Sequence, residues 1–371
     1  MKNLADFNLE KNPFQHITPT PGANQEELSP WAGMPSLYSK IENVYRGLLQ
    51  NTPRQVVLNW GPYGGGKTFA AYHFIENYGS KIYDITQIYI RSPKSGKNAN
   101  KELYDNIINY LSVRKIKRQV KRMIELMGED ELFDFLQNRL KNEEIVEGIL
   151  KIATDDPDEA AIMKRYIFSN VTATELKKVG LAKKIDWGTD SIKFLAGIIL
   201  CFTGDQDSFK GRVVIWIDEM EDMIYYSQKE YRAFSQVLRD LIDQVNQYFT
   251  LFFNFTLAET EEQTIELLLG SAMWSRIDKK IRFSELDDKG ALEYCKDLLN
   301  HFQIDSSKGE YSPFGKEVLE TIWKMIPNNK LTPREINRYC SSVLNFAISE
   351  NADEINLALV AECFEAIAED E

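Results

Sequence analysis

The chain has 371 residues and a formal net charge of −12. Hydrophobic residues make up 43% of the sequence and aromatic residues 12%, which excludes an intrinsically disordered chain and predicts a packed protein of roughly two or three substructures. The acidic balance excludes a uniformly basic surface, so contact with nucleic acid would require a local basic patch.

The chain begins with a segment that does not read as a regular element. Residues 1–35 are rich in Pro, Asn, Gln and Thr and are predicted to form an extended arm, with Phe14 and Trp31 as apolar anchors. Residues 36–50 carry apolar side chains at helical spacing, so a helix is expected to follow the arm.

A glycine-rich motif comes next, between an apolar run at residues 55–60 and a helical pattern at residues 69–75. Residues 61–68 match G-x-x-x-x-G-K-[ST] at every fixed position, and strand, loop and helix occur in the order that this motif requires. Glycines let backbone N–H groups turn toward a phosphate, Lys67 neutralises charge on the β and γ phosphates, and the Thr68 hydroxyl can ligate Mg²⁺. The predicted nucleotide-binding residues are Gly61, Pro62, Tyr63, Gly64, Gly65, Gly66, Lys67 and Thr68.

A long helical region separates this motif from the next apolar strand. Residues 81–90 alternate like a strand and are closed by a turn at residues 92–96, after which residues 101–205 follow an almost continuous helical pattern. A compact α/β core would reach its next strand sooner. Roughly residues 113–190 are therefore predicted to form a helical insertion.

One basic cluster lies in this insertion, and it consists of Arg114, Lys115, Lys117, Arg118, Lys121 and Arg122. Such a cluster can follow a nucleic-acid backbone, because contacts from Lys and Arg to phosphates dominate that affinity. The alternative is a solvated helix face that is neutralised by the acidic residues at 125 and 129–131. Both interpretations stay open at this point.

The second chemical signal is an apolar strand that ends in two acids. Residues 212–217 form a continuous apolar run, typical of a strand buried on both faces, and Asp218 and Glu219 follow it. Asp218 can hold Mg²⁺ and Glu219 can polarise an attacking water, which with Lys67 is the minimum apparatus for phosphoryl transfer. The structural alternative is an acidic cap on the strand, since acidic residues continue to position 222.

The remaining elements complete an α/β pattern with a helical end. Strands alternating with helices, and then helices alone, predict a parallel α/β sheet with a helical cap domain. The predicted elements are a helix over 231–246, strands over 249–256 and 280–283, and helices over 289–302, 314–326, 332–350 and 355–369. The predicted division is an arm over 1–35, a core over 36–285 that includes the insertion, and a helical lid over 286–371.

The order of these signals resembles the AAA+ ATPases, especially the clade of origin-recognition and initiator-loading ATPases. Similar ATPases occur in bacterial anti-phage systems of the phage-exclusion type. The resemblance spans about residues 12–350 without the insertion, and it is most specific at residues 61–68 and at Asp218-Glu219. It implies an AAA+ P-loop NTPase core with a parallel sheet, a helical insertion and a C-terminal all-helical lid, with ATP and Mg²⁺ as cofactors.

The resemblance also implies roles for residues outside the two motifs. Residues 251–256 are similar to the sensor 1 strand, whose polar end orients the lytic water. Asn254 and Thr256 lie on one face of a strand, so periodicity does not choose between them. Arg276 and Ile277 resemble the Ser-Arg-Phe box, whose arginine completes the site of a neighbouring subunit. For Arg276 the structural alternative is a surface salt bridge, for example with the nearby Asp at position 278.

A proline-containing helix start supplies a further arginine. Thr332 is a suitable N-cap, Pro333 suits the first helical position, and Glu335 is predicted to complete a capping box with Thr332. Arg334 in this first turn resembles sensor 2, the lid arginine that reaches the nucleotide phosphates, and a solvated arginine is the alternative. Residues 31–35 lie where the family carries its adenine box, with Met-Pro in place of the family's charged pair.

Several features bear on where the protein acts. The four cysteines and three histidines are scattered, which argues against zinc and favours reduced thiols. The first residues lack the apolar core of a signal peptide, and no apolar run approaches the roughly 18 residues of a membrane span. We therefore expect a soluble, cytoplasmic protein without a membrane partner.

The predicted function is an AAA+ ATPase that binds and hydrolyses ATP with Mg²⁺ at subunit interfaces. It is expected to assemble with copies of itself or with an effector protein, as a motor or switch in a DNA-associated process such as anti-phage defence, replication or transposition. The winged-helix domain of the initiator ATPases is not found in the sequence, so DNA contact would use the insertion, core loops or a partner. The alternatives are a nucleotide-gated scaffold whose hydrolysis is incidental and, third, a small-molecule kinase.

Overall fold

The computed structural model describes residues 2–15, 30–50, 53–257 and 262–370. These residues form a five-stranded parallel sheet with the strand order β2-β3-β4-β1-β5. The strands are β1 (Gln55–Gly61), β2 (Asp84–Arg91), β3 (Gly211–Asp218), β4 (Phe249–Thr256) and β5 (Lys279–Arg282). Because the strands run in one direction, their carboxyl ends meet at one edge of the sheet, where ligands bind in open α/β folds.

The inner strands β1, β3 and β4 are buried along nearly their whole length. Their sequences are almost continuously apolar, as a strand covered on both faces requires. Between them, the rings of Trp216 and Phe252 stack with a centroid distance of 3.7 Å and an interplanar angle of 3°. The strands predicted over 55–60, 212–217 and 249–256 are confirmed to within about one residue, whereas β2 begins three residues later than predicted.

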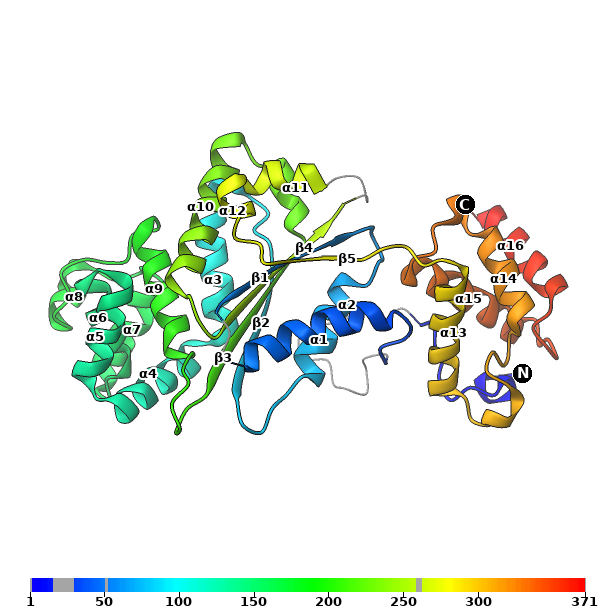
Figure 1. Cartoon of the computed structure of the whole chain (residues 1–371), viewed down its shortest axis with the longest axis horizontal. Helices are drawn as coiled ribbons and strands as arrows, with labels where there is room; N and C mark the ends of the chain where they lie inside the picture. The colour runs from blue at the N-terminus through cyan, green and yellow to red at the C-terminus, as the bar shows by residue number, and fades with distance from the viewer. Residues whose placement is uncertain (1, 16–29, 51–52, 258–261, 371) are drawn as a thin grey trace.

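Helices cover both faces of the sheet, so the core has three layers (Figure 1). These helices are α1 (Pro35–Leu49), α2 (Lys67–Asn77), α3 (Ala99–Leu111), α9 (Thr189–Cys201), α10 (Gln228–Gln244), α11 (Glu262–Leu269) and α12 (Ser271–Trp274). On one face, α1 and α2 pack on the sheet through a cluster that includes Ile41, Phe74 and Trp216. On the other face, α3, α9 and α10 share a larger cluster with strand residues such as Ile88 and Ile215.

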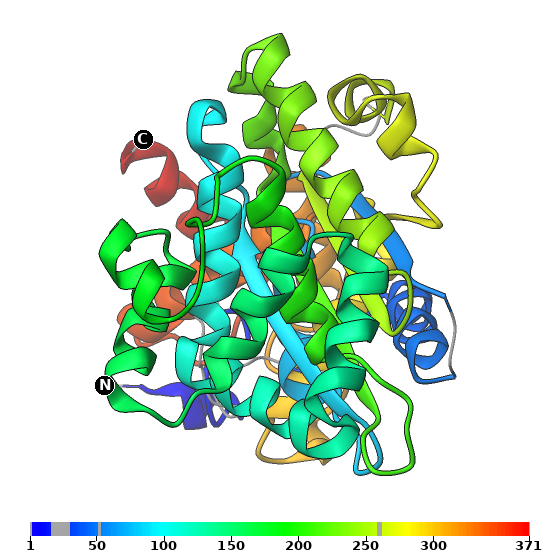
Figure 2. The ribbon, with the colours of Figure 1, turned by 90° about the vertical axis from the view of Figure 1, so that its left-hand side faces the viewer.

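A helical insertion lies between α3 and α9. Its helices are α4 (Val113–Met127), α5 (Glu129–Leu140), α6 (Glu143–Leu150), α7 (Pro157–Ile167) and α8 (Ala173–Lys178). Because α4, α5 and α6 pack against α9, the insertion shares the hydrophobic core of that sheet face. Figure 2 shows these helices in front of the strands, and Figure 1 shows them at the opposite end of the molecule from the C-terminal helices.

The C-terminal helices form a second hydrophobic core, which we call the lid. They are α13 (Asp288–Phe302), α14 (Lys316–Met325), α15 (Pro333–Ser349) and α16 (Leu357–Asp370). N-terminal residues belong to this core as well: Phe7, Leu9 and Phe14 are buried in it, and Leu9 forms a bridge with Gln303. Of the predicted arm, residues 16–29 lie outside the described residues, and residues 2–15 are packed on the lid instead of extended.

A buried cation fixes the start of β3. Arg212 is fully buried, with its guanidinium between the rings of Tyr83 and Tyr248 at 4.7 and 4.3 Å. Nε donates to the Leu48 carbonyl oxygen at 3.0 Å, and Nη2 pairs with Asp205 at 2.8 Å. Because the guanidinium stacks on two rings and its N–H groups have hydrogen-bond partners, its positive charge can be buried. The strand that carries Asp218 is therefore anchored at its opposite end.

The remaining regular segments are short 3₁₀ turns that connect the larger elements. They are η1 (Leu4–Phe7), η2 (Gly96–Asn98), η3 (Lys151–Ala153), η4 (Met220–Tyr225), η5 (Ser306–Lys308) and η6 (Pro327–Asn329). Within the described ranges, no helix has the length and apolar character needed to cross a membrane. The four cysteines are buried free thiols.

Candidate active site

The glycine-rich loop predicted at residues 61–68 lies between β1 and α2, at the carboxyl edge of the sheet. Close approach of other segments requires glycine at two positions. A Cβ atom on Gly61 would lie 1.9 Å from the Phe283 carbonyl oxygen, and one on Gly64 would lie 2.7 Å from Cβ of Arg334. Gly64 also has a φ of +78°, in the left-handed region that favours glycine. The loop is thus enclosed between the segment after β5 and the lid.

Lys67 begins α2, and its ammonium group folds back into the loop. Nζ donates hydrogen bonds to the carbonyl oxygens of Gly61 at 2.9 Å and Pro62 at 2.8 Å. Burial lowers the pKa of Lys67 from 10.5 to about 8, against the raising effect of the Glu221 and Asp218 carboxylates. A lysine among carbonyl oxygens at a helix N-terminus is well placed to receive a phosphate.

Asp218 ends β3 and is held by three donors. Its Oδ2 accepts hydrogen bonds from Thr68 Oγ1 at 2.6 Å and from the Tyr89 hydroxyl at 2.8 Å. Its Oδ1 accepts from the Glu219 backbone N–H at 3.0 Å. Tyr89 comes from β2 and was not predicted as a site residue, because an aromatic side chain in an alternating strand gives no sign of its tertiary partner.

Glu219 follows with the backbone in a left-handed conformation, at a φ of 58°, which non-glycine residues seldom adopt. Its Oε1 lies 3.5 Å from Nε of Arg91 at the end of β2, and this carboxylate raises the pKa of Arg91. The Glu219 side chain is 37% exposed and lines the cavity between core and lid. The second acid of the predicted pair is thus accessible to water.

A third carboxylate reaches the same cavity. Glu221, in η4, accepts a hydrogen bond at Oε2 from the backbone N–H of Thr256 at 2.8 Å, and burial raises its pKa. In the sequence this residue appears only as part of the acidic run after β3. The turn of η4 is what brings it back toward the end of β4.

The structure distinguishes Asn254 from Thr256, the two candidates for the polar residue at the end of β4. Thr256 lines the cavity. Asn254 is fully buried, and its Oδ1 accepts a hydrogen bond from Nδ2 of Asn59 on β1 at 2.9 Å. Among the described residues that line the cavity, β4 contributes Thr256 and not Asn254. Asn254 therefore links two strands beneath the site.

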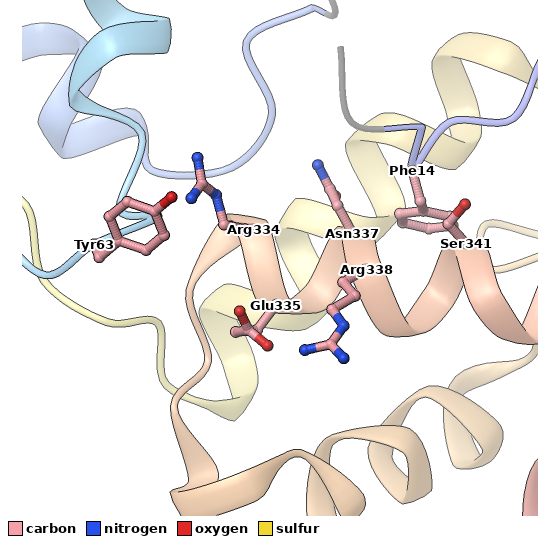
Figure 3. Close-up of a pocket in the computed structure, with 7 residues that line it drawn as sticks. All are labelled: Phe14, Tyr63, Arg334, Glu335, Asn337, Arg338 and Ser341. Atoms are coloured by element: carbon pink, nitrogen blue, oxygen red, sulfur yellow. The ribbon is translucent and has the colours of Figure 1, made fainter. Parts of the chain in front are cut away.

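The lid meets the glycine-rich loop at the start of α15. The backbone N–H of Arg334 donates to the Gly64 carbonyl oxygen at 3.3 Å, and its guanidinium carbon lies 3.9 Å from the centre of the Tyr63 ring. Figure 3 shows these two side chains next to each other. Thr332 caps the helix by accepting from the Glu335 N–H at 3.3 Å. The capping box was predicted incorrectly, because the Thr332 N–H donates to a carbonyl two residues earlier and not to the Glu335 carboxylate.

These residues surround one cavity of about 360 Å³ between core and lid. The polar part of its lining comes from the loop, the acids after β3 and Arg334. The apolar and aromatic part consists of Pro30, Trp31, Ala32, Met34, Leu37, Tyr294 and Leu298. Trp31 is fixed there by edge contacts with Tyr38 and His73. The segment predicted beside the adenine therefore does line the cavity.

Arg276 lies elsewhere. It precedes β5, at the amino edge of the sheet, and is not among the described residues that line the cavity. Its Nε and Nη2 donate to both carboxylate oxygens of Asp243 on α10, at 2.8 and 2.6 Å. Asp278, the partner named for a surface pair, instead accepts from the Val56 N–H at 2.7 Å. The salt bridge exists, but with a different partner.

Most of the basic cluster on α4 is engaged within the molecule. Lys117 donates to the Thr154 carbonyl oxygen at 2.5 Å, and Lys121 pairs with Asp155 at 2.6 Å. Arg122 pairs with Asp84 at 2.8 Å, and Lys115 lies over the Phe202 ring. Arg114 and Arg118 are exposed. The carboxylates of the Lys121 and Arg122 ion pairs come from positions 155 and 84, whereas the alternative from the sequence named acidic residues at 125 and 129–131.

The cavity has the features that ATP and Mg²⁺ require. Nε of Arg334 is buried without a hydrogen-bond partner, so the lid offers an unused donor beside the loop. Thr68 and Asp218 present a hydroxyl and a carboxylate oxygen, the ligand types that Mg²⁺ uses together with phosphates. The apolar part of the lining suits a planar base. The residues present therefore fit both groups.

Comparison with known proteins places the fold. No family model matches the chain, and no curated protein matches it in sequence. Among solved structures, it is similar to the ORC2 protein of Aeropyrum pernix, described in ADPNP–ADP complexes, with 11% identity, a TM-score of 0.51, and coverage of 96% of this chain and 71% of that one. It is also similar to the Aeropyrum pernix ORC1 protein in complex with DNA, with 9% identity and a TM-score of 0.50.

The second similarity covers 91% of this chain but only 66% of the ORC1 chain. At these identities the likeness concerns the fold. The parallel sheet, the loop between β1 and α2 and the C-terminal helices all agree with it. The chain therefore has the predicted fold class, a parallel α/β core with a phosphate-binding-type loop after β1, a helical insertion and a C-terminal helical lid, and it shares this fold with the two ORC proteins.

Proposed function

We propose that this chain is an ATPase that binds ATP with Mg²⁺ in the cavity between core and lid and hydrolyses it there. The observation that carries the proposal is the convergence of five side chains, from four segments of the chain, on that cavity. The loop with Lys67, the acids Asp218 and Glu219, Thr256 at the end of β4, and Arg334 from the lid all line it. Phosphoryl transfer depends on such positioning and electrostatics more than on covalent chemistry.

The proposed roles follow from the surroundings of each side chain. Thr68 and Asp218 would hold Mg²⁺, which supplies neutralising charge to the phosphates when bound. Lys67 gives its ammonium to the phosphate chain. Glu219 receives the proton of the attacking water, and its Oε1 lies 3.5 Å from Nε of Arg91. Thr256, and not the buried Asn254, supplies the polar group at the strand end.

The main test of the proposal is the substitution Glu219→Gln. It is expected to leave ATP binding near the wild-type level and to lower hydrolysis by about 10²- to 10⁴-fold, because the proton acceptor is lost. Lys67→Ala is the matched control, since it should lose binding itself. The measurements are the Kd for ATP and the rate of phosphate release. Wild-type turnover in the Gln variant would refute the assignment of the site.

Assembly is the second part of the proposal. Arg276 lies at the amino edge of the sheet, away from the cavity of its own chain, and this location supports a role at the site of a neighbouring copy. Its bidentate pair with Asp243 would have to open for that role. The pair is partly exposed, so opening it costs little, less than about 1 kcal/mol.

A DNA-associated setting, anti-phage defence among others, completes the proposal and is supported by the sequence resemblance to phage-exclusion ATPases. The internal pairs of α4 leave Arg114 and Arg118 as the side chains to test for DNA contact. Replacing both with Gln breaks none of the ion pairs described above. If DNA stimulates hydrolysis through this face, the double variant loses the stimulation and keeps basal hydrolysis. A plaque assay in cells that carry the gene, with the Glu219→Gln variant as control, tests the defence setting.

A nucleotide-gated scaffold is the second candidate function. The observation that favours it is the internal pairing of most of the basic cluster, which reduces the charge available to DNA. In that case hydrolysis is slow and insensitive to DNA, while ATP changes the oligomer size or the binding of a partner protein. Light scattering with and without a slowly hydrolysed ATP analogue separates the two functions.

A further inference from the structure

Tyr63 has an unusual environment for an aromatic residue in a phosphate-binding loop. Its side chain is 69% exposed, yet one face of its ring lies against the guanidinium of Arg334, 3.9 Å from centroid to guanidinium carbon. Hydrophobic burial does not explain an exposed ring at this place. Both side chains line the cavity and also the neighbouring pocket that Figure 3 draws, so the pair lies where the core loop meets the lid.

Other contacts hold the backbone of Arg334 but not its charge. The Arg334 N–H donates to Gly64, and the absence of a Cβ on Gly64 lets the two chains approach. The guanidinium Nε, in contrast, is buried and has no hydrogen-bond partner. What fixes the charged end is the π face of Tyr63, an attraction worth roughly a two- to five-fold change in equilibrium at an exposed site.

This attraction acts against a repulsion. Lys67 and Arg334 line the same cavity, so their two positive charges face a shared space and repel each other. Without an anion between them, a free guanidinium would turn toward solvent. The ring keeps it beside the cavity.

We propose that Tyr63 is a positioning residue that holds the guanidinium of Arg334 beside the cavity before nucleotide binds. The lid arginine is then already in place when phosphates arrive, so less conformational freedom is lost on binding. The binding part of this inference rests on the proposed function. The ordering of Arg334 in the nucleotide-free protein does not.

Two substitutions at Tyr63 distinguish the contribution of the aromatic ring from the contributions of side-chain bulk and of the hydroxyl group. Tyr63→Phe keeps the π face, and Tyr63→Leu keeps an apolar side chain without it. Tyr63→Leu is expected to weaken ATP binding by roughly two- to five-fold, and Tyr63→Phe is expected to bind like the wild type. The same pair of variants in an Arg334→Met background should show no difference, because the charge that the ring holds is gone.

A second measurement uses the nucleotide-free protein. Hydrogen exchange of the Arg334 Nε–H, followed by NMR, is expected to be faster in Tyr63→Leu than in the wild type and unchanged in Tyr63→Phe. Exchange in α16, on the far part of the lid, serves as the internal control. It should be the same in all three proteins.

Each outcome decides the inference. Tyr63→Leu equal to the wild type in both measurements overturns it, as does Tyr63→Phe as weak as Tyr63→Leu. Tighter ATP binding by Tyr63→Leu also overturns it, because the ring would then compete with nucleotide for Arg334. If the folded wild-type protein binds no ATP, the proposed function fails, and hydrogen exchange alone judges Tyr63.

Discussion

Two acidic side chains follow β3 into the same cavity but have different surroundings. Glu219 is partly exposed, and its Oε1 lies 3.5 Å from Nε of Arg91. Glu221 is half-buried, and this burial raises its pKa. Its carboxylate accepts a hydrogen bond from the backbone N–H of Thr256. A proton acceptor must reach water. Glu219 meets this condition with a side chain that is 37% exposed, whereas Glu221 is suited to hold the end of β4.

The corresponding prediction compares the variants in which each of these two glutamates is replaced by glutamine. Glu219→Gln is expected to lower hydrolysis by about 10²-fold or more, and Glu221→Gln by less than about ten-fold. The Gln at position 221 keeps an oxygen that accepts the N–H of Thr256, so the strand end stays in place. Steady-state phosphate release at saturating ATP measures both. The reverse order would assign the proton acceptor to Glu221.

Tyr89 leads to a prediction about metal. Its hydroxyl donates to Asp218, so Tyr89→Phe removes one of the donors that orient the proposed Mg²⁺ ligand. Loss of such a supporting contact is expected to raise the Mg²⁺ concentration for half-maximal hydrolysis by about 10- to 100-fold. Tyr104→Phe is the matched control, because its buried hydroxyl donates to the Ile167 carbonyl oxygen, remote from the cavity. An unchanged Mg²⁺ titration in Tyr89→Phe contradicts this role.

The residues that the sequence identifies are those whose chemistry follows a local pattern. The loop around Lys67 and the acids at 218–219 have fixed spacing beside recognisable strands. Tyr89 and Glu221 reach the cavity only through tertiary contacts, so no spacing predicts them. Asn254 and Thr256 share a strand face, and only the depth of burial, known from the fold, separates them.

At the scale of elements, one ion pair joins α10 to the turn after α12. Because Arg276 gives two hydrogen bonds to Asp243, the connection has a defined geometry on a partly exposed surface. It lies where β5 begins, and the proposed role of Arg276 lies outside its own subunit. The same side chain thus has an observed partner and a proposed one.

Matched substitutions separate these roles. Arg276→Ala and Asp243→Asn both remove the internal pair, so both are expected to cost less than about 1 kcal/mol of stability. A role at a neighbouring site predicts that only Arg276→Ala lowers hydrolysis, by about 10³-fold, with ATP binding kept. Mixing this variant with Lys67→Ala subunits should restore part of the activity. Equal hydrolysis in both single variants contradicts the role in trans.

Elements were predicted well where one physical signal dominates. The inner strands are continuous apolar runs, and the helix at residue 333 has Thr332 and proline at its start. The anchor at Arg212 was missed, because a charged residue at the start of a strand normally indicates exposure, and its burial depends on two tyrosines distant in sequence. The carboxylate half of the capping box did not form, since a backbone carbonyl takes the Thr332 N–H.

At the scale of the whole molecule, the lid is assembled from both ends of the described chain. Phe14 is fully buried and meets the Phe314 ring edge to face at 5.6 Å. Phe14→Ala is expected to destabilise the lid by about 3–5 kcal/mol through lost burial and a cavity. Leu357→Ala, at an exposed lid position, should change stability by less than about 0.5 kcal/mol.

Because the lid carries Arg334, the Phe14→Ala change should also weaken ATP binding without a direct contact. Hydrogen exchange should rise in α13–α16 and stay constant in the sheet, which has its own core. Global unfolding together with the sheet would contradict the independence of the two cores. Sequence alone did not predict this arrangement: residues 2–15 resemble a polar linker, and their few apolar side chains find partners about 300 residues later.

The joining of residues 2–15 to the lid has a consequence for biosynthesis. These residues leave the ribosome before the sheet, whereas α13–α16 leave it after the sheet. The sheet can close around its own core during translation, but Phe7, Leu9 and Phe14 must wait, unburied, until α13–α16 have been made. The lid thus matures after the sheet, and nascent chains released before α15 is made have a completed phosphate-binding loop without the arginine that faces it.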